Sequence, residues 1–237
     1  DGIADPNSVT MGFAKAAKQL GVTIEREVEV TGIGLNADRI TEIQTSAGPI
    51  ETRIVVNAAG PWSHQIGQMV ATSIPVQPFR RHIFIADVPP DPKGLALEAR
   101  TSPSTRILTI DFDTTFYFHR ESTGILFGMG DPDEPSSFEQ SVNWDLLERI
   151  APVAARRLPV LADAGISTAW AGLYEMTPDA MPIIGPVPER PGFFIISGFS
   201  GHGFQHSPAA GRILADIITD RSPGEIDLAP FAFDRFA

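Results

Sequence analysis

The residues best placed to do chemistry lie between Gly198 and Pro208, where three glycines and two histidines stand close together. They follow an apolar run, residues 193–197, that predicts a buried strand, and they precede a segment that predicts a helix over residues 208–219. Ser207 is the expected N-cap of that helix, with Pro208 in its first turn. Glycine lets the backbone approach a ligand closely, and a helix start offers unpaired N–H groups. The pattern predicts a site for an anion or a developing oxyanion; the alternative is an ordinary strand-to-helix turn.

The two histidines of this stretch, His202 and His206, are four residues apart, a spacing that can mark a metal-binding pair on a helix. They straddle Gly203 in a turn, and no His-Glu signature or third ligand accompanies them. We therefore predict no metal site.

Helices and strands in alternation must position these residues, so the predicted fold class is α/β. Helical spacing predicts helices over residues 8–20, from Ser63, and over residues 143–158, where Pro152 should kink or break the helix. Alternation predicts a three-stranded meander from Val28 to Val56, whose third strand runs on through Ala59 as a strand covered on both faces. Further runs predict a second, antiparallel sheet and one more strand: residues 81–86, 106–112, 115–120, 124–129 and 165–176. A Pro-rich loop is expected at residues 88–92.

One glycine pattern resembles a dinucleotide-binding motif by spacing alone. Residues 32–37 follow a strand and fit the dinucleotide-binding spacing G-x-G-x-x-A. That motif should open a helix, yet the next residues keep strand periodicity. We predict a hairpin turn here rather than a phosphate loop.

Composition excludes several classes of function. The chain has 237 residues, of which 43% are hydrophobic and 20% charged, as in a folded soluble protein. Acidic residues outnumber basic ones by 29 to 18, so nucleic acid is not an expected partner. With no cysteine, the chain has no disulfide, thiolate metal site or cysteinyl-linked cofactor. No apolar stretch is long enough to span a membrane and no signal pattern is present, and we expect a cytoplasmic protein.

Five motifs in order resemble the second half of the D-amino-acid oxidase family. The nearest patterns are those of sarcosine oxidase beta subunits, sarcosine and dimethylglycine dehydrogenases, and glycine and proline oxidoreductases. The motifs are Asp1-Gly2 with Asp5-Pro6, and residues 56–63, 170–179, 182–185 and 198–203. They cover essentially the whole chain.

The resemblance implies FAD as cofactor and a division into two lobes. An incomplete Rossmann-like FAD-binding lobe would comprise residues 1–74 and 186–237, and a substrate lobe built on a mixed or antiparallel sheet would comprise residues 75–185. The family's G-x-G-x-x-G turn would precede Asp1, on a preceding segment or a partner subunit.

The resemblance also implies which residues meet FAD. Val30 would lie beside the adenine through its backbone. The ADP part would be lined by Ala58, Ala59, Gly60 and Trp62. The turn that begins at Gly198 would face the pyrimidine edge of the flavin with Gly201, His202, Gly203, Phe204 and Gln205.

The candidate substrate-binding residues lie in the proposed substrate lobe, and one candidate catalytic residue, His202, lies in the FAD-binding lobe. Tyr174 stands where glycine-oxidase-like members carry an arginine for the substrate carboxylate, and a tyrosine cannot form that bidentate pair. Arg81 and Arg120 are the candidate replacements within the chain. Along the strand 115–120, Tyr117 and His119 share one face while Arg120 takes the other. We predict that Tyr117 and His119 face the flavin and act in catalysis together with Tyr174 and His202; the alternative is an ordinary half-exposed strand.

The predicted reaction is oxidation of the C–N bond of a small amine or amino acid, similar to sarcosine, proline or glycine, by hydride transfer to FAD. The only lysines are Lys15, Lys18 and Lys93, and none matches the lysine that activates oxygen in monomeric sarcosine oxidases, so a dehydrogenase is favoured over an oxidase. One alternative is a flavin dehydrogenase acting on a 2-hydroxy acid or glycerol phosphate, with His119 or His202 as base. Another is a truncated, inactive fragment or a binding subunit without flavin.

Overall fold

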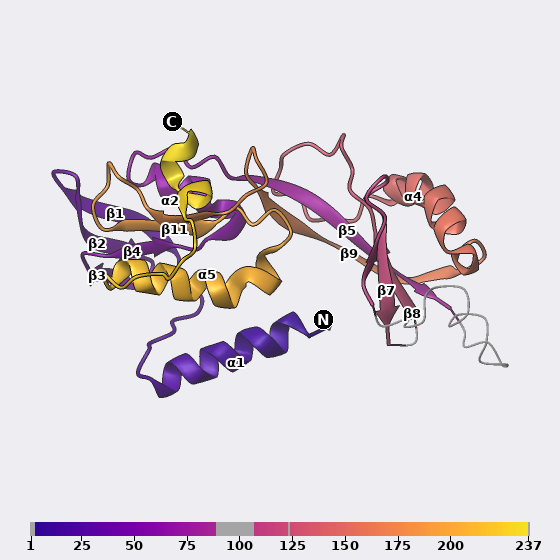
Figure 1. Cartoon of the computed structure of the whole chain (residues 1–237), viewed down its shortest axis with the longest axis horizontal. Helices are drawn as coiled ribbons and strands as arrows, with labels where there is room; N and C mark the ends of the chain where they lie inside the picture. The colour runs from indigo at the N-terminus through magenta and orange to yellow at the C-terminus, as the bar shows by residue number, and fades with distance from the viewer. Residues whose placement is uncertain (1–2, 89–106, 123, 237) are drawn as a thin grey trace. The chain divides into compact units, whose positions relative to one another are not determined.

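The computed structural model describes residues 3–88, 107–122 and 124–236. The chain forms two compact units (Figure 1). The glycine-turn unit comprises Pro6–Pro78 and Tyr174–Ala237, and the five-stranded unit comprises Asp1–Asp5 and Phe79–Leu173. The class is α/β with antiparallel and mixed sheets, as predicted. Which lobe binds FAD and which binds substrate stays a prediction, and the expected Pro-rich loop lies, apart from Val88, outside the described residues.

The glycine-turn unit begins with helix α1 (Pro6–Gln19), which ends before Gly21 in the left-handed region at φ +89°. A meander follows, made of β1 (Val30–Asn36), β2 (Arg39–Thr45) and β3 (Gly48–Glu51). Asn36 pairs with Arg39 across a two-residue turn, and Ala37 takes φ +52°. The predicted hairpin at the glycine pattern of residues 32–37 is therefore confirmed.

A second three-stranded sheet has the order β10-β11-β4. Strand β11 (Phe193–Ser197) pairs antiparallel with β10 (Ile183–Pro186) and parallel with β4 (Val55–Asn57). The predicted third meander strand was wrong in two ways. The chain leaves the meander after Glu51 and β4 joins the other sheet, and Val56 is 40% exposed, so β4 is not covered on both faces within the described residues.

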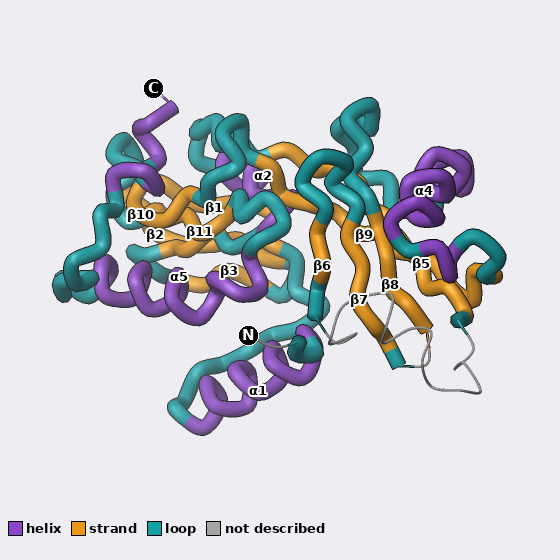
Figure 2. The backbone as a smooth tube through the Cα atoms, turned by 45° about the vertical axis from the view of Figure 1, so that its right-hand side comes forward, coloured by secondary structure: helices purple, strands orange, loops and turns teal. Residues whose placement is uncertain are grey.

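Strands β10 and β11 direct alternate side chains into two cores of this unit. Ile183, Phe193 and Ile195 pack with Ile33 and Ile40 of the meander. On the other face, a core forms against helix α5 (Gly203–Ile218), which runs along the sheet (Figure 2). The buried members of that core are Ile184, Phe199, Ala210, Ile213 and Leu214, and the partly buried Phe194 and Ile196 of β11 pack against them. The last residues form short 3-10 turns, Ala229–Phe231 and Phe233–Phe236, whose phenylalanines pack on these two cores.

Helix α5 corrects the predicted helix start. It begins at Gly203, five residues before Pro208, and Ser207 is not its N-cap. A proline inside a helix cannot donate to the carbonyl four residues earlier, which here belongs to Phe204. The Ser207 hydroxyl donates to that carbonyl instead, at 2.9 Å. The side chain thus supplies the bond that Pro208 cannot make, and the helix continues through the proline.

The five-stranded unit is a sheet of order β6-β7-β8-β5-β9. Its strands are β5 (Gln77–Asp87), β6 (Thr109–Ile110), β7 (Tyr117–Glu121), β8 (Gly124–Gly128) and β9 (Gly165–Met176). Strands β6 and β7, β7 and β8, and β5 and β8 all pair antiparallel, as predicted. The predicted strand at residues 106–112 shrinks to two residues of regular pairing, and Arg106 lies outside the described part of the chain.

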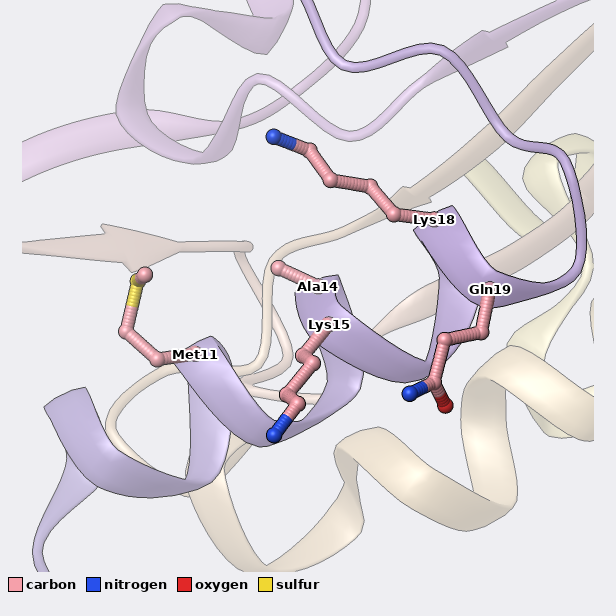
Figure 3. Close-up of a pocket in the computed structure, with 5 residues that line it drawn as sticks. All are labelled: Met11, Ala14, Lys15, Lys18 and Gln19. Carbon is pink, nitrogen blue, oxygen red and sulfur yellow. The ribbon is translucent and has the colours of Figure 1, made fainter.

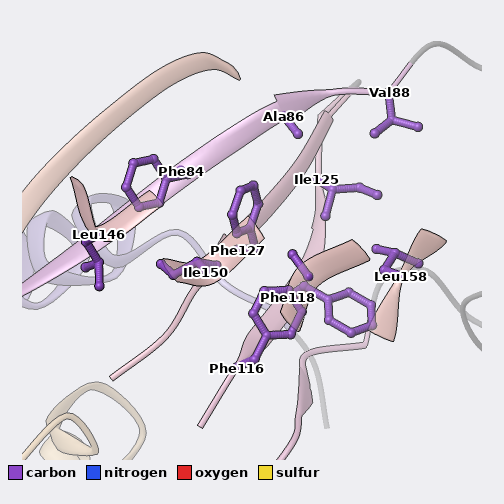
Figure 4. Packing of buried hydrophobic residues seen from close by; sticks show 11 residues of the cluster. Phe84, Ala86, Val88, Phe116, Phe118, Ile125, Phe127, Leu146, Ile150 and Leu158 are labelled. Carbon is purple, nitrogen blue, oxygen red and sulfur yellow. The ribbon is translucent and has the colours of Figure 1, made fainter. Parts of the chain in front are cut away.

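Helix α4 (Trp144–Arg157) covers one face of this sheet, followed by a 3-10 turn at Pro159–Leu161. Phe84 of β5 and Phe127 of β8 stack with ring centroids 5.7 Å apart, and Leu146, Ile150 and Leu158 close the core against them (Figure 4). Of the kink or break predicted at Pro152, the break does not occur, because the helix runs on through it. Burial of one helix face on the sheet outweighs the single lost backbone bond.

Candidate functional site

The glycine turn between β11 and α5 has the backbone that its sequence predicts. Gly198 and Gly201 take φ of +82° and +94°, and Ser200 between them takes +52°. Two features exclude a side chain at Gly201. Its positive φ favours glycine, and a Cβ there would lie 2.7 Å from Cζ of Tyr174. The turn is therefore a bare stretch of backbone held against an aromatic ring.

The turn delivers the chain to an open helix start. His202 is the N-cap of α5, yet no side chain caps the helix, and its first turn contains no acidic residue. The first N–H groups of α5 belong to Gly203, Phe204 and Gln205, and the residues around them are mostly exposed. Such N–H groups, together with the helix dipole, can bind an anion or a partial negative charge.

A second turn follows the parallel neighbour of β11. After β4, the 3-10 turn η1 (Gly60–Trp62) leads into helix α2 (Ser63–Gln68). The helix predicted to begin at Ser63 is therefore present. Gly60 takes φ +54°, and the Asn57 carboxamide accepts from the N–H of Ala59 at 3.1 Å. Because β4 and β11 are parallel, their carboxyl ends meet at one edge of the sheet. The predicted residues 58–62 and 198–205 therefore follow the same edge.

A polar network joins the two turns, and sequence reasoning missed it. The Ser63 hydroxyl donates to the Ser197 hydroxyl at 2.7 Å, and Ser197 donates to Oε2 of Glu175 at 2.7 Å. The N–H of Phe199 donates to Oε1 of Glu175 at 3.4 Å. Ser63 and Ser197 are 0% and 1% exposed. The only signal in the sequence is polar residues within apolar motifs, since the two serines are 134 residues apart.

In the five-stranded unit, three predicted residues lie on one face of the sheet. Phe118 points into the core under α4, so its neighbours Tyr117 and His119 point to the opposite face. Arg81 lies on that face too, because it alternates with the buried His82 on β5. Arg120 takes the core side of β7 by the same alternation. The structure thus groups Arg81, but not Arg120, with the predicted catalytic pair.

The contacts of His119, Tyr117 and Arg81 show which of their atoms already have partners. His119 donates from Nδ1 to the carbonyl of Arg120 at 2.8 Å, which leaves Nε2 as the ring's acceptor. The Tyr117 ring lies over Gly128, its partner in β8, where a Cβ would lie 2.6 Å from Cζ of the tyrosine. Arg81 donates to the carbonyl of Arg80 at 2.9 Å.

Other predicted site residues lie as follows. His202 stacks on His206 with ring centroids 6.2 Å apart, and Tyr174 packs against the glycine turn. Val30 opens β1 opposite Thr45, and Trp62 is 44% exposed. Within residues 3–88, 107–122 and 124–236, no group of three or more His, Asp or Glu side chains could hold a metal ion.

An open hollow runs along α1 (Figure 3). Its lining comes from that one helix: Met11, Ala14, Lys15, Lys18 and Gln19. It holds no acid–base pair, and we assign no chemistry to it. No helix in the described part of the chain is long and apolar enough to cross a membrane.

Comparison with known proteins identifies a matching family, related sequences and related structures. Residues 1–217 match the family described as FAD dependent oxidoreductase. The FAD-dependent oxidoreductase domain-containing protein 1 of Bos taurus is 31% identical over 271 residues, which cover 100% of this chain and 54% of the bovine protein. The mitochondrial sarcosine dehydrogenase of Mus musculus is 28% identical over 251 residues, which cover 100% of this chain and 26% of the mouse protein. The chain thus spans about half or less of these relatives' length.

Among solved structures, L-proline dehydrogenase from P. horikoshii superposes with a TM-score of 0.82 at 30% identity, covering 98% of this chain and 61% of that chain. Glycine oxidase from Geobacillus kaustophilus superposes with a TM-score of 0.78 at 24% identity, covering 94% of this chain and 56% of that chain, and so agrees in fold.

Proposed function

We propose that this chain, which belongs to the FAD dependent oxidoreductase family, contributes to the oxidation of the C–N bond of a small amine or amino acid by hydride transfer to FAD. The observation that carries the proposal is the glycine turn that opens on the uncapped start of α5. Two of the relatives act, by their names, on sarcosine and L-proline. We therefore propose a secondary amino acid of this kind as substrate.

The described residues fit FAD at the glycine turn. When bound, FAD supplies the hydride acceptor, and its reduction builds negative charge on the pyrimidine edge of the ring. The N–H groups of Gly203, Phe204 and Gln205 are the first of α5 and have no carboxylate in the same turn, so they can stabilise that charge. Gly198 and Gly201 let the backbone come close, because neither presents a Cβ.

The second turn is the proposed site for the ADP part. Ala58, Ala59, Gly60 and Trp62 follow a strand whose carboxyl end adjoins that of β11. Ligands of open α/β sheets bind at such strand ends. Val30, at the start of β1, is the proposed neighbour of the adenine.

The face of the five-stranded sheet that carries Arg81, Tyr117 and His119 is the proposed substrate surface. Arg81 would pair with the substrate carboxylate, since it shares the face of Tyr117 and His119 while Arg120 does not. His119 would accept a proton at Nε2, because Nδ1 already donates to a carbonyl. Tyr174, packed on Gly201, would shape the site beside the glycine turn rather than bind a carboxylate. The dehydrogenase preference rests on lysine usage: Lys15 and Lys18 lie on α1, and Lys93 lies outside the described residues.

The test is the visible absorption spectrum of the purified protein with FAD, followed under anaerobic conditions by sarcosine, proline and glycine in turn. We expect flavin bands that bleach with a secondary amine. Bleaching by lactate or glycerol 3-phosphate alone would replace the amine by a hydroxyl substrate. A protein that stays colourless in excess FAD would remove the proposal altogether.

A matched pair of variants tests the substrate face. Arg81→Gln should raise KM for the amino acid about tenfold or more, the effect of losing a charged hydrogen bond. Arg120→Gln, on the same sheet but the opposite face, should leave KM within about twofold. Equal effects of the two substitutions would contradict the proposed face.

A further inference from the structure

Glu175, near the end of β9, contacts the glycine turn at successive points. Its backbone carbonyl accepts from the N–H of Ser200 at 3.1 Å, and its Oε1 accepts from the N–H of Phe199. Its other oxygen, Oε2, accepts from the Ser197 hydroxyl, at the carboxyl end of β11. One residue therefore fixes the end of the strand and the first half of the turn.

The same carboxylate also reaches the turn after β4. The single hydroxyl proton of Ser197 can go either to Oε2 of Glu175 or to the carbonyl of Gly60, 3.2 Å away, and Ser197 accepts from Ser63, the first residue of α2. The carbonyl of Ser63 in turn accepts from the Asn57 carboxamide at 2.9 Å. Oε2 of Glu175 lies 3.5 Å from the position a Cβ would take at Gly60. The bonds that involve Ser63 are buried, those to Glu175 and Gly60 are partly buried, and together they connect the two turns.

We infer that Glu175 is a positioning residue that sets the spacing and orientation of the two turns proposed to hold FAD. This inference rests on the proposed function and names the residue that couples its two halves. The backbone N–H groups at the start of α5 can stabilise flavin charge only when the turn before them is held in one conformation. Glu175 and Ser197 supply that constraint through hydrogen bonds to the turn and not through contact with FAD.

Substitution by glutamine distinguishes geometry from charge. In Glu175→Gln, the amide oxygen can accept from Phe199 and the amide nitrogen can donate to Ser197, which then donates to the Gly60 carbonyl. All partners remain satisfied without the negative charge. In Glu175→Ala, the N–H of Phe199 and the Ser197 hydroxyl lose their shared acceptor.

The experiment measures the dissociation constant of FAD and the visible circular dichroism of the bound flavin for both variants, for Ser197→Ala and for the exposed control Glu189→Ala. Glu175→Ala should weaken FAD binding about tenfold or more and change the flavin circular dichroism, while Glu175→Gln should stay within about threefold of the parent protein. Ser197→Ala should change the spectrum in the same direction, and it keeps the test open if Glu175→Ala does not fold. Glu189→Ala should change nothing.

Two outcomes overturn the inference. Unchanged FAD affinity and circular dichroism in both Glu175→Ala and Ser197→Ala would mean that the network does not position the turns. Equal losses in Glu175→Ala and Glu175→Gln would mean that charge, and not geometry, matters. If the parent protein itself does not bind FAD, the proposed function fails instead, so the two failures are distinguishable.

Discussion

Helices α4 and α5 begin in opposite ways. The Asn143 side chain accepts from the N–H of Asp145 at the start of α4, Asp145 adds a negative charge in the first turn, and Arg156 and Arg157 follow in the last. Helix α5 has neither a side-chain cap nor an acidic residue in its first turn, and no basic residue in its last. Helix α4 therefore satisfies its own termini, whereas α5 leaves its N–H groups and partial positive charge for something else. This contrast supports the proposal that the uncapped start of α5 and the glycine turn before it bind FAD together.

Closing the open start of α5 should have the strongest consequence. Gly201→Ala places a methyl group at φ +94° against the Tyr174 ring, a position that only glycine takes without strain. We expect a loss of about 2–4 kcal/mol of unfolding free energy from strain and overpacking, together with loss of FAD binding. Thermal unfolding and FAD titration measure the two effects. Gly211→Ala is the control, because a Cβ there meets nothing within 4 Å; if both variants bound FAD normally, the turn would not be a cofactor site.

Removing the N-cap of α4 should lower the unfolding free energy by less than Gly201→Ala does, and it should not change FAD binding. Asn143→Ala deletes the acceptor of the Asp145 N–H, which lowers the unfolding free energy by about 1 kcal/mol. Chemical denaturation measures that loss. The FAD dissociation constant should stay at its parent value, and a shift comparable with that of Gly201→Ala would contradict the functional contrast between the two helix starts.

The same contrast separates what the sequence predicts from what it hides. The glycine turn was predictable, because an ordinary turn after a buried strand seldom requires three glycines. The start of α5 was not, because Ser207 and Pro208 have the residue types of an N-cap and a first turn, and only the bond from Ser207 to Phe204 allows the helix to begin earlier. Pro152 is a second such case, because proline is a residue type that breaks helices and yet α4 continues through it.

Most of the site's support was hidden for a different reason. Glu175, Ser63 and Ser197 each lie within an apolar motif, where a single polar residue can serve many structural roles. Their pairing depends on β4 and β11 being parallel neighbours, which alternation within one strand cannot reveal. Likewise, alternation along one strand placed Tyr117 and His119 on one face and Arg120 on the other, but only the pairing of β5 with β8 and of β8 with β7 adds Arg81 to the face of Tyr117 and His119.

A smaller effect tests why α5 tolerates its internal proline. Ser207→Ala removes the hydroxyl that donates to the Phe204 carbonyl, so that carbonyl loses the donor that replaced the proline N–H. We expect a loss of about 0.5–1 kcal/mol of unfolding free energy, the net worth of one partly exposed hydrogen bond. Amide hydrogen exchange should become faster in the first turn of α5. Ser222→Ala, in an exposed loop after the helix, is the control, and equal exchange in both variants would count against the proposed bond.

The weakest effect is a pH dependence of the unfolding free energy that originates at His82, beside the start of α4. His82 is 1% exposed, and its Nε2 accepts from the N–H of Asn143 at 3.0 Å. Burial, followed by the nearby Arg80 guanidinium, lowers the pKa of His82, against partial opposition from Glu134 and Asp131. Below its ordinary pKa of about 6.5, the unfolded chain binds a proton that the folded chain does not, so the free energy of unfolding falls as pH falls from there. His82→Gln should flatten this slope between about pH 7 and pH 5 in urea titrations. A slope that His82→Gln leaves unchanged would assign the acid sensitivity to other groups.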